Sequence, residues 1–135
     1  MTLVSPLAAS ALVALGGGIG SLTRYQAGRA LARVAGPQAL ATFPWATLTV
    51  NVLGSLAMGL LAGWLARHGS ANETWRLFIG VGLLGGFTTF SAFSLEMMLL
   101  IERGQASTAF VYAAVSLLAG LSALYIGLIV MRVAA

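Results

Sequence analysis

The 135-residue sequence contains no cysteine, no lysine and no aspartate, and only 7% of its residues are charged. The lack of cysteine excludes disulfides and thiolate metal sites. The basic residues are seven arginines that occur singly, so the chain has no basic run, and we expect no nucleic-acid partner. Because soluble domains contain about 25% charged residues, this composition excludes an ordinary soluble domain.

Long apolar runs take the place of the missing charge. Hydrophobic residues make up 59% of the chain, and its mean hydropathy is +0.96. A bilayer core of about 30 Å is crossed by about 20 apolar residues in a helix. We therefore expect one all-α domain over residues 1–135 that lies in the lipid bilayer and crosses it four times. The expected spans are about 3–23, 45–66, 77–100 and 107–131.

Short polar or proline-containing segments separate the four spans. Pro37 and Pro44 indicate a loop between the first two spans, and residues 102–105, Glu-Arg-Gly-Gln, predict a turn between the last two. No lysine or arginine precedes the first span, as would be usual in a secretory signal peptide, so we expect this span to be retained.

The arginines divide almost evenly between the two sides of the membrane. With four spans the two groups are Arg67, Arg76 and Arg132 on one side, and Arg24, Arg29, Arg33 and Arg103 on the other. An excess of positive charge on one side normally fixes orientation. The near balance permits insertion in both orientations and pairing of two copies as an antiparallel homodimer. Alternatively, Arg24 lies within the membrane and flanking details fix one orientation; the counts leave both open.

Small and polar residues inside the spans are more specific signals. Gly59 and Gly63 form a GxxxG pattern, which most often serves close helix packing. Asn51 lies deep in the second span, where its carboxamide either forms a structural hydrogen bond between helices or lines water. Glu96, near the end of the third span, is either buried or interfacial. Ser116 in the fourth span is expected to bond to its own helix, as isolated serines usually do.

The stretch Gly82–Glu96, GLLGGFTTFSAFSLE, gathers glycines, hydroxyls and aromatic rings in one place. Gly85–Gly86 and Thr88–Thr89 lower the helix propensity, which predicts a break in the third span. Carbonyl groups freed at membrane depth must be buried in protein or line a cavity. Phe90 and Phe93 share a helix face, and aromatic ring edges carry positive charge. Rings and hydroxyls together favour a narrow path for a small anion over the ordinary alternative, core packing.

Three segments resemble one known family. GGFTTFSAFSLE (85–96) is similar to the third-span signature of the small bacterial fluoride channels, the Fluc (CrcB) family. TLTVNVLGS (47–55) resembles the second-span motif of that family, and GGGIGSLTRY (16–25) resembles its first-span motif. The resemblance implies a passive channel that exports cytoplasmic fluoride across the bacterial inner membrane. It also implies an antiparallel dual-topology homodimer with two pores and a central structural sodium ion.

The resemblance also implies roles for individual residues. The residues that match pore positions are Asn51, Phe90, Phe93, Glu96, Tyr112 and Ser116. Arg24 matches the arginine of an aqueous vestibule, and the backbone carbonyls of Gly85 and Thr88 match the sodium ligands. We add the hydroxyls of Ser91 and Ser94 as further donors, because a pore must replace the water shell of fluoride.

The chain departs from the family pattern at two positions. Gly120, four residues after Ser116, stands where some members carry a second serine of a polar track, and Ala92 stands where many have threonine. Each change removes a hydroxyl donor. The polar track is therefore expected to be shorter here or to be completed by water.

Other functions fit the sequence less well. A small dual-topology, proton-coupled multidrug exporter also has four spans, but it needs a membrane-embedded carboxylate, usually in the first span. This chain has no acid before Arg24, and only Glu96 lies near the hydrocarbon. A non-transporting membrane subunit would account for the packing glycines, but not for the break, the hydroxyls and Asn51 together. No catalytic constellation is visible, so we do not expect an enzyme.

Overall fold

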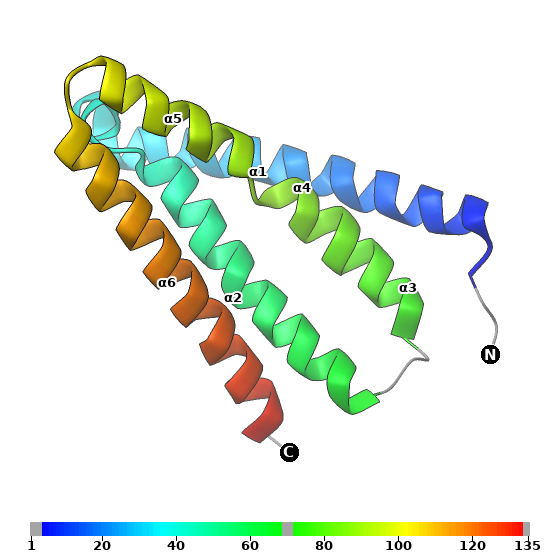
Figure 1. Ribbon diagram of the computed structural model, residues 1–135. Coiled ribbons are helices and arrows are strands. Elements are labelled where there is room, and N and C mark those ends of the chain that lie inside the picture. The colour runs from blue at the N-terminus through cyan, green and yellow to red at the C-terminus, as the bar shows by residue number, and fades with distance from the viewer. Residues whose placement is uncertain (1–3, 69–71, 134–135) are drawn as a thin grey trace.

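The computed structural model describes residues 4–68 and 72–133, and its regular elements in these ranges are all helices. In chain order they are α1 (Pro6–Thr42), α2 (Trp45–His68), α3 (Glu73–Trp75), the π-helix η2 (Arg76–Leu84), α4 (Gly85–Phe87), α5 (Phe90–Glu102) and α6 (Ala106–Val133) (Figure 1). Four stretches are long and apolar enough to span a bilayer: Pro6–Thr42, Trp45–Arg67, Glu73–Glu102 and Ala106–Val133. The expected all-α, multi-pass membrane fold is confirmed.

Helix α1 is longer than a single membrane crossing requires. The part before Gly36, residues 6–35, is ~45 Å long at 1.5 Å per residue, and it continues through the three arginines that follow residue 23. Gly36 interrupts it with a φ of 79°, and Pro37 then begins a last helical piece that ends at Thr42. Proline is tolerated at the start of a helix because its missing N–H would be unpaired there. The loop expected from Pro37 to Pro44 is therefore wrong for residues 37–42.

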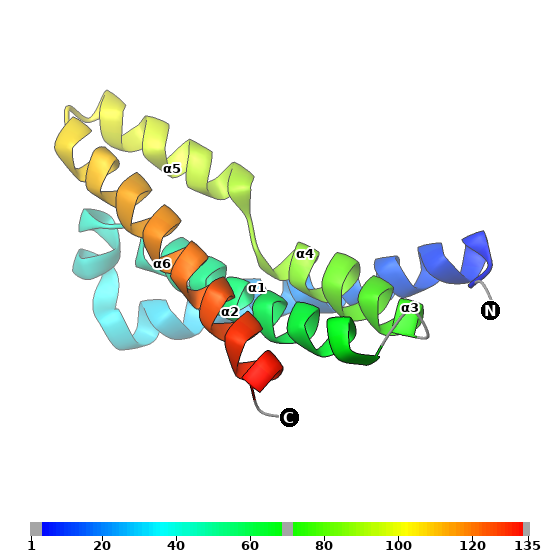
Figure 2. The ribbon, with the colours of Figure 1, turned by 60° about the horizontal axis from the view of Figure 1, so that its bottom comes forward.

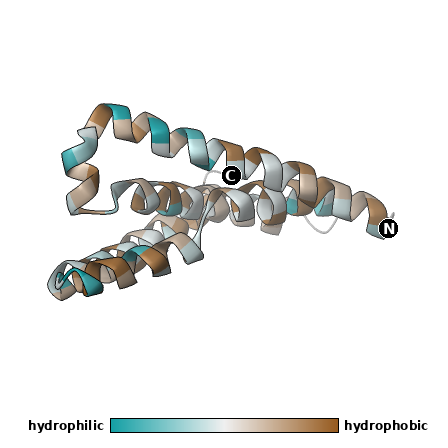
Figure 3. Ribbon diagram, turned by 90° about the horizontal axis from the view of Figure 1, so that it is seen from above, coloured by the Kyte–Doolittle hydropathy of each residue, from teal (hydrophilic) through white to brown (hydrophobic). Residues whose placement is uncertain are grey.

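The helices run back and forth between two ends of the molecule. Both described chain ends, the end of α2 and the start of α3 lie toward one end, and the α1–α2 and α5–α6 connections lie toward the other (Figure 1). The turn expected at 102–105 is confirmed: Gly104 has a φ of 73°, and Gln105 N–H donates to the carbonyl of Leu100. Hydrophilic residues gather on the C-terminal half of α1 and at the α5–α6 turn, while most other helix surface is apolar (Figure 3).

Glycines bring the helices into backbone contact. A Cβ on Gly20 would overlap the carbonyl oxygen of Leu83 in η2, and one on Gly59 of α2 would overlap the carbonyl oxygen of Leu124 in α6. Without side chains at these points, α1 packs directly on η2 and α4, and α2 packs on α6. The packing role expected for Gly59 is confirmed.

The third membrane-spanning stretch changes partners at its midpoint. Before Thr88 it lies along α1; after Thr89 it leaves α1, and α5 runs beside α6 (Figure 2). The small buried cluster that α5 and α6 share with α2 consists of Leu48, Leu100, Ala109 and Tyr112. The change of partner places the Thr88–Thr89 segment at the junction of all the long helices, which is where the site residues meet.

Candidate functional site

The backbone is extended over the two residues between α4 and α5. Thr88 has φ −82° and ψ 158°, and Thr89 has φ −149° and ψ 120°. In a continuous helix, Thr89 N–H would donate to the carbonyl of Gly85, and Ala92 N–H to that of Thr88. Here Thr89 N–H donates to Asn51 Oδ1 (2.8 Å) and Ala92 N–H to Thr89 Oγ1 (3.2 Å). The carbonyls of Gly85 and Thr88 thereby lose their helical donors.

Asn51 of α2 contacts this extended segment with both ends of its carboxamide. Its Oδ1 accepts the Thr89 N–H, and its Nδ2 donates to the Thr89 carbonyl at 3.0 Å. The interhelical hydrogen bond considered as one reading of Asn51 is therefore present. Because Nδ2 has two hydrogens, one donor remains beyond this contact.

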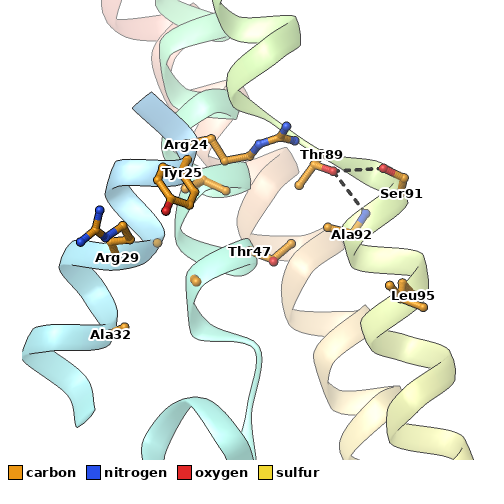
Figure 4. Close-up of a pocket in the computed structure, with 12 residues that line it drawn as sticks. Arg24, Tyr25, Arg29, Ala32, Thr47, Thr89, Ser91, Ala92 and Leu95 are labelled. Atoms are coloured by element: carbon orange, nitrogen blue, oxygen red, sulfur yellow. Dashed lines mark hydrogen bonds between the residues drawn. The ribbon is translucent and has the colours of Figure 1, made fainter. Parts of the chain in front are cut away.

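Two cavities flank the extended segment. The larger, of about 660 Å³, lies between the C-terminal half of α1, the start of α2 and the start of α5 (Figure 4). Arg24, Arg29, Thr89 and Ser91 are among its lining residues, and Arg24 Nη1 donates to the Thr88 carbonyl at 3.5 Å. The smaller, of about 270 Å³, is lined by Asn51, Gly54, Ser55, Met58, Thr88, Thr89, Phe90 and Leu124. Thr89 borders both cavities, so the extended segment contacts each of them.

The two candidate pore rings lie together at the start of α5, as their spacing predicts. The centroids of Phe90 and Phe93 are 5.7 Å apart. Phe93 also packs against the ring of Tyr112 (5.0 Å), whereas Phe90 is 79% exposed on this single chain. One ring is thus supported by α6, and the other has a face that nothing in the described part of the chain covers.

Below the rings, Glu96 joins three helices. Its two carboxylate oxygens accept hydrogen bonds from Thr47 of α2 (2.6 Å) and Tyr112 of α6 (2.8 Å). One turn after Tyr112, the buried hydroxyl of Ser116 has no hydrogen-bond partner among residues 4–68 and 72–133. The expectation that Ser116 bonds to its own helix is therefore wrong.

The two serines of α5 differ in what they can offer. Ser94 Oγ donates to the carbonyl of Phe90 at 2.9 Å, so its single proton is already used. Ser91 is exposed, and its Oγ lies 3.4 Å from Thr89 Oγ1. Ser91 is the better candidate donor of the pair.

Comparison with known proteins identifies the family of this chain. Residues 11–128 match the family model described as CrcB-like protein, Camphor Resistance (CrcB). The chain belongs to the CrcB family. A relative from Novosphingobium aromaticivorans, named fluoride-specific ion channel FluC, is 56% identical over 126 residues, covering 93% of this chain and 98% of its own. Proteins with that name from Erythrobacter litoralis (50% identical, 98% of each chain) and Caulobacter vibrioides (51%, covering 90% of this chain and 93% of its own) are also similar.

The resemblance to the CrcB family implied a sodium ion, and the carbonyls named for it have suitable chemistry. No group of three or more His, Cys, Asp or Glu side chains could hold a metal within the part of the chain that the structure describes. Carbonyl oxygens, however, suit hard cations, and those of Gly85 and Thr88 have lost their helical donors. Arg24 uses one lone pair of the Thr88 oxygen, and a carbonyl has two. The two carbonyl oxygens of this chain therefore have the chemistry that a hard cation needs.

Two residues of the site in this CrcB-family protein were not expected from the sequence. Thr47 bonds to Glu96, and Ser55 Oγ lies 3.6 Å from the point where a Cβ on Gly120 would stand. Thr47, Asn51 and Ser55 follow one another at intervals of four residues, so they share one face of α2. That spacing was visible in the sequence and could have identified both residues.

Proposed function

We propose that this protein is a fluoride-specific ion channel that conducts passively and exports cytoplasmic fluoride across the bacterial inner membrane. One observation supports this above all: a polar, partly free backbone segment lies beside the Asn51 carboxamide and the Phe90 and Phe93 rings, in a chain that matches relatives named fluoride-specific ion channel over 98% of their length.

Selectivity would come from donors held in a narrow path. Fluoride is small and strongly hydrated, so each water that it loses must be replaced by a donor from the protein. The remaining Nδ2–H of Asn51, the Ser91 hydroxyl and the positive ring edges of Phe90 and Phe93 can supply them. The free hydroxyl of Ser116 would extend this line of donors. Chloride is larger, and rings in this position would exclude it.

Three of the expected pore residues need a more specific role. Ser94 would have to leave the Phe90 carbonyl to donate to fluoride, so we assign it to holding that carbonyl. Tyr112 and Thr47 already donate to Glu96, and this contact joins α2, α5 and α6 beneath the rings. We place Glu96 and Tyr112 at the wall of the path.

The working unit would be an antiparallel homodimer with dual topology. The near-even arginine distribution supports it, and so does the exposed face of Phe90, which a second copy would cover. Two copies related by an axis in the membrane plane would form two pores. We propose a structural sodium ion on that axis, held by the carbonyls of Gly85 and Thr88 from both chains. When bound, it would supply fixed positive charge in a medium of low dielectric constant, where Coulomb interactions are strong.

The test is ion efflux from liposomes that contain the purified protein. Electrode recordings should show rapid fluoride efflux and no chloride efflux under the same driving force. An inward or outward sodium gradient should leave the fluoride flux unchanged, because the sodium is structural. Liposomes that release chloride as readily as fluoride would refute the function, and uphill fluoride movement driven by sodium would refute passive conduction.

A further inference from the structure

We infer that Asn51 is a positioning residue for the extended Thr88–Thr89 segment, and that this segment in turn fixes which side of the Asn51 carboxamide faces an anion. The first half of this inference depends only on the hydrogen bonds of the described chain. The second half rests on the proposed function.

Asn51 forms the two hydrogen bonds that a neighbouring β-strand would form with an extended residue. A peptide group in a sheet receives one N–H and donates one of its own, and the carboxamide of Asn51 does the same for Thr89: Oδ1 accepts its N–H at 2.8 Å, and Nδ2 donates to its carbonyl at 3.0 Å. Within a membrane-spanning stretch, backbone groups outside a helix need partners in the protein or in a cavity, and Asn51 is the partner of both Thr89 groups. The extended conformation of Thr89 therefore depends on this side chain.

Gly54, one turn later on α2, leaves the space that the Thr88–Thr89 segment occupies. A Cβ at Gly54 would overlap the Cγ2 methyl of Thr88, so the absence of a side chain leaves room for that methyl. On its other side Thr88 is tied to α4, because its N–H and its hydroxyl both donate to the carbonyl of Leu84, at 3.0 and 2.9 Å. Asn51 and Gly54 thus hold the segment where η2–α4 ends and α5 begins.

The same contact determines the orientation of the carboxamide. A flipped amide would place Nδ2 against the Thr89 N–H and Oδ1 against the Thr89 carbonyl. A donor would then face a donor, and an acceptor would face an acceptor, so neither hydrogen bond could form. The observed orientation is the one that satisfies both bonds. It keeps Oδ1 on the Thr89 N–H and leaves an Nδ2–H, in a cavity that Phe90 also lines. An anion there meets a donor, not a carbonyl oxygen.

The hydrogen bond between Asn51 and the Thr89 N–H also affects the carbonyl of Gly85. Since the Thr89 N–H is bound to Asn51, it cannot return to Gly85 as it would in a helix. Asn51 thereby keeps that carbonyl available while presenting its own N–H to the anion path. One side chain connects the two features on which the proposed function depends.

Amide hydrogen exchange of the full-length protein in detergent, without fluoride, tests the positioning role. In the native protein the Thr89 amide should be protected. Asn51→Ala should speed its exchange at least about tenfold, the effect of ~1.4 kcal/mol. Asn51→Asp keeps an oxygen that accepts the N–H but places its other oxygen against the Thr89 carbonyl, so Thr89 exchange should be slower than in Asn51→Ala though faster than in the native protein. Fluoride flux should fall more than tenfold because the variant has no Nδ2–H and adds a negative charge.

The control is Thr49→Val, a nearly isosteric change two residues away from Asn51. It removes a hydroxyl from the wall of a different, apolar cavity between α1 and α2. The exchange rate of the Thr89 amide should stay as in the native protein. The amide of Ala123, buried in α6, reports whether each variant is folded. If Asn51→Ala leaves α6 protected and Thr89 exchange unchanged, or if Asn51→Asp exchanges as fast as Asn51→Ala, the positioning role is refuted.

This measurement separates the inference from the proposed function. A native protein that conducts fluoride but shows no effect of Asn51→Ala on Thr89 exchange overturns the inference and leaves the channel function standing. A native protein that fails to conduct fluoride but shows the expected exchange pattern supports the positioning role and overturns the anion-facing half.

Discussion

The two halves of the third membrane-spanning stretch are held in different ways. Before Thr88, η2 and α4 lie against α1 with glycines on both sides: a Cβ on Gly16 would overlap the Phe78 carbonyl oxygen, and one on Gly86 would lie 2.5 Å from that of Gly17. After Thr89, α5 is joined to its neighbours by side chains, through the Phe93–Tyr112 ring contact and the bonds to Glu96.

This difference separates a structural half, η2 and α4, from the half that would line the anion path, α5. We call them the scaffold half and the path half. Backbone-to-backbone contact with α1 leaves no room on that face for an ion or a water molecule, so the face of η2–α4 that meets α1 serves packing. The half with rings and hydroxyls keeps polar groups that face cavities and can be shared with a ligand. The extended segment lies at the border between the two, and Asn51 binds it there.

The largest effect is expected from adding a side chain to the scaffold half. Gly20→Val should prevent α1 from packing on η2, because its Cβ would overlap the Leu83 carbonyl oxygen; overpacking typically costs about 1–3 kcal/mol, and more where backbone must move. Gly18→Val is the matched control, since a Cβ there meets nothing within 4 Å. Size-exclusion profiles and thermal unfolding in detergent should separate the two; equal behaviour would show that this contact does not hold the fold.

The next effect concerns how two copies complete the path. Gln38→Arg with Gln105→Arg adds two arginines to the side that already has four, which should force one orientation and abolish fluoride flux in liposomes. A twin with Arg33→Gln, Arg103→Gln and Asn72→Arg is biased the other way and should also be inactive alone. Coexpression of the two should restore flux. Full activity of either variant alone would exclude the antiparallel pair.

The ring pair tests the path half directly. Phe90→Ile and Phe93→Ile should each lower fluoride flux more than about tenfold, since an aliphatic side chain has no positive edge, while the dimer still assembles. Phe93→Ile should also lower the unfolding temperature, because it loses the contact with Tyr112. Phe110→Ile, at a 75% exposed ring on α6, is the control. Fluoride flux equal to that of the native protein in both variants would mean that the rings only pack.

Much of this arrangement could be predicted from local sequence. Apolar runs indicate four membrane helices, and the three-residue spacing of Phe90 and Phe93 indicates that their rings lie together, as they do. Both predictions depend only on length and helical period. The continuation of α1 to Thr42 could not be predicted in this way, because Pro37 is a loop signal in the sequence, whereas in the structure it is the first residue of a helical piece after Gly36.

Contacts between helices lie beyond such local rules. That Asn51 meets Thr89, and that Thr47 meets Glu96, depends on how α2 is placed and rotated against α5, which no single segment determines. The serines show the same limit: Ser94 bonds to its own helix, whereas Ser116, which was expected to do so, has a free hydroxyl in the part of the chain that is described.

The smallest effect concerns the hydroxyl that Gly120 lacks. Ser55 Oγ lies 3.6 Å from where a Cβ on Gly120 would stand, so α2 supplies a hydroxyl to the place where α6 has none. Ser55→Ala should lower fluoride flux about threefold, as the loss of ~0.7 kcal/mol from one neutral hydrogen bond predicts. Adding Gly120→Ser to that variant should restore the flux, because the hydroxyl then comes from α6. Gly120→Ser alone should change little, since the donor is already present. If the double variant conducts no better than Ser55→Ala, the two positions are not interchangeable, and water must complete the track beyond Ser116.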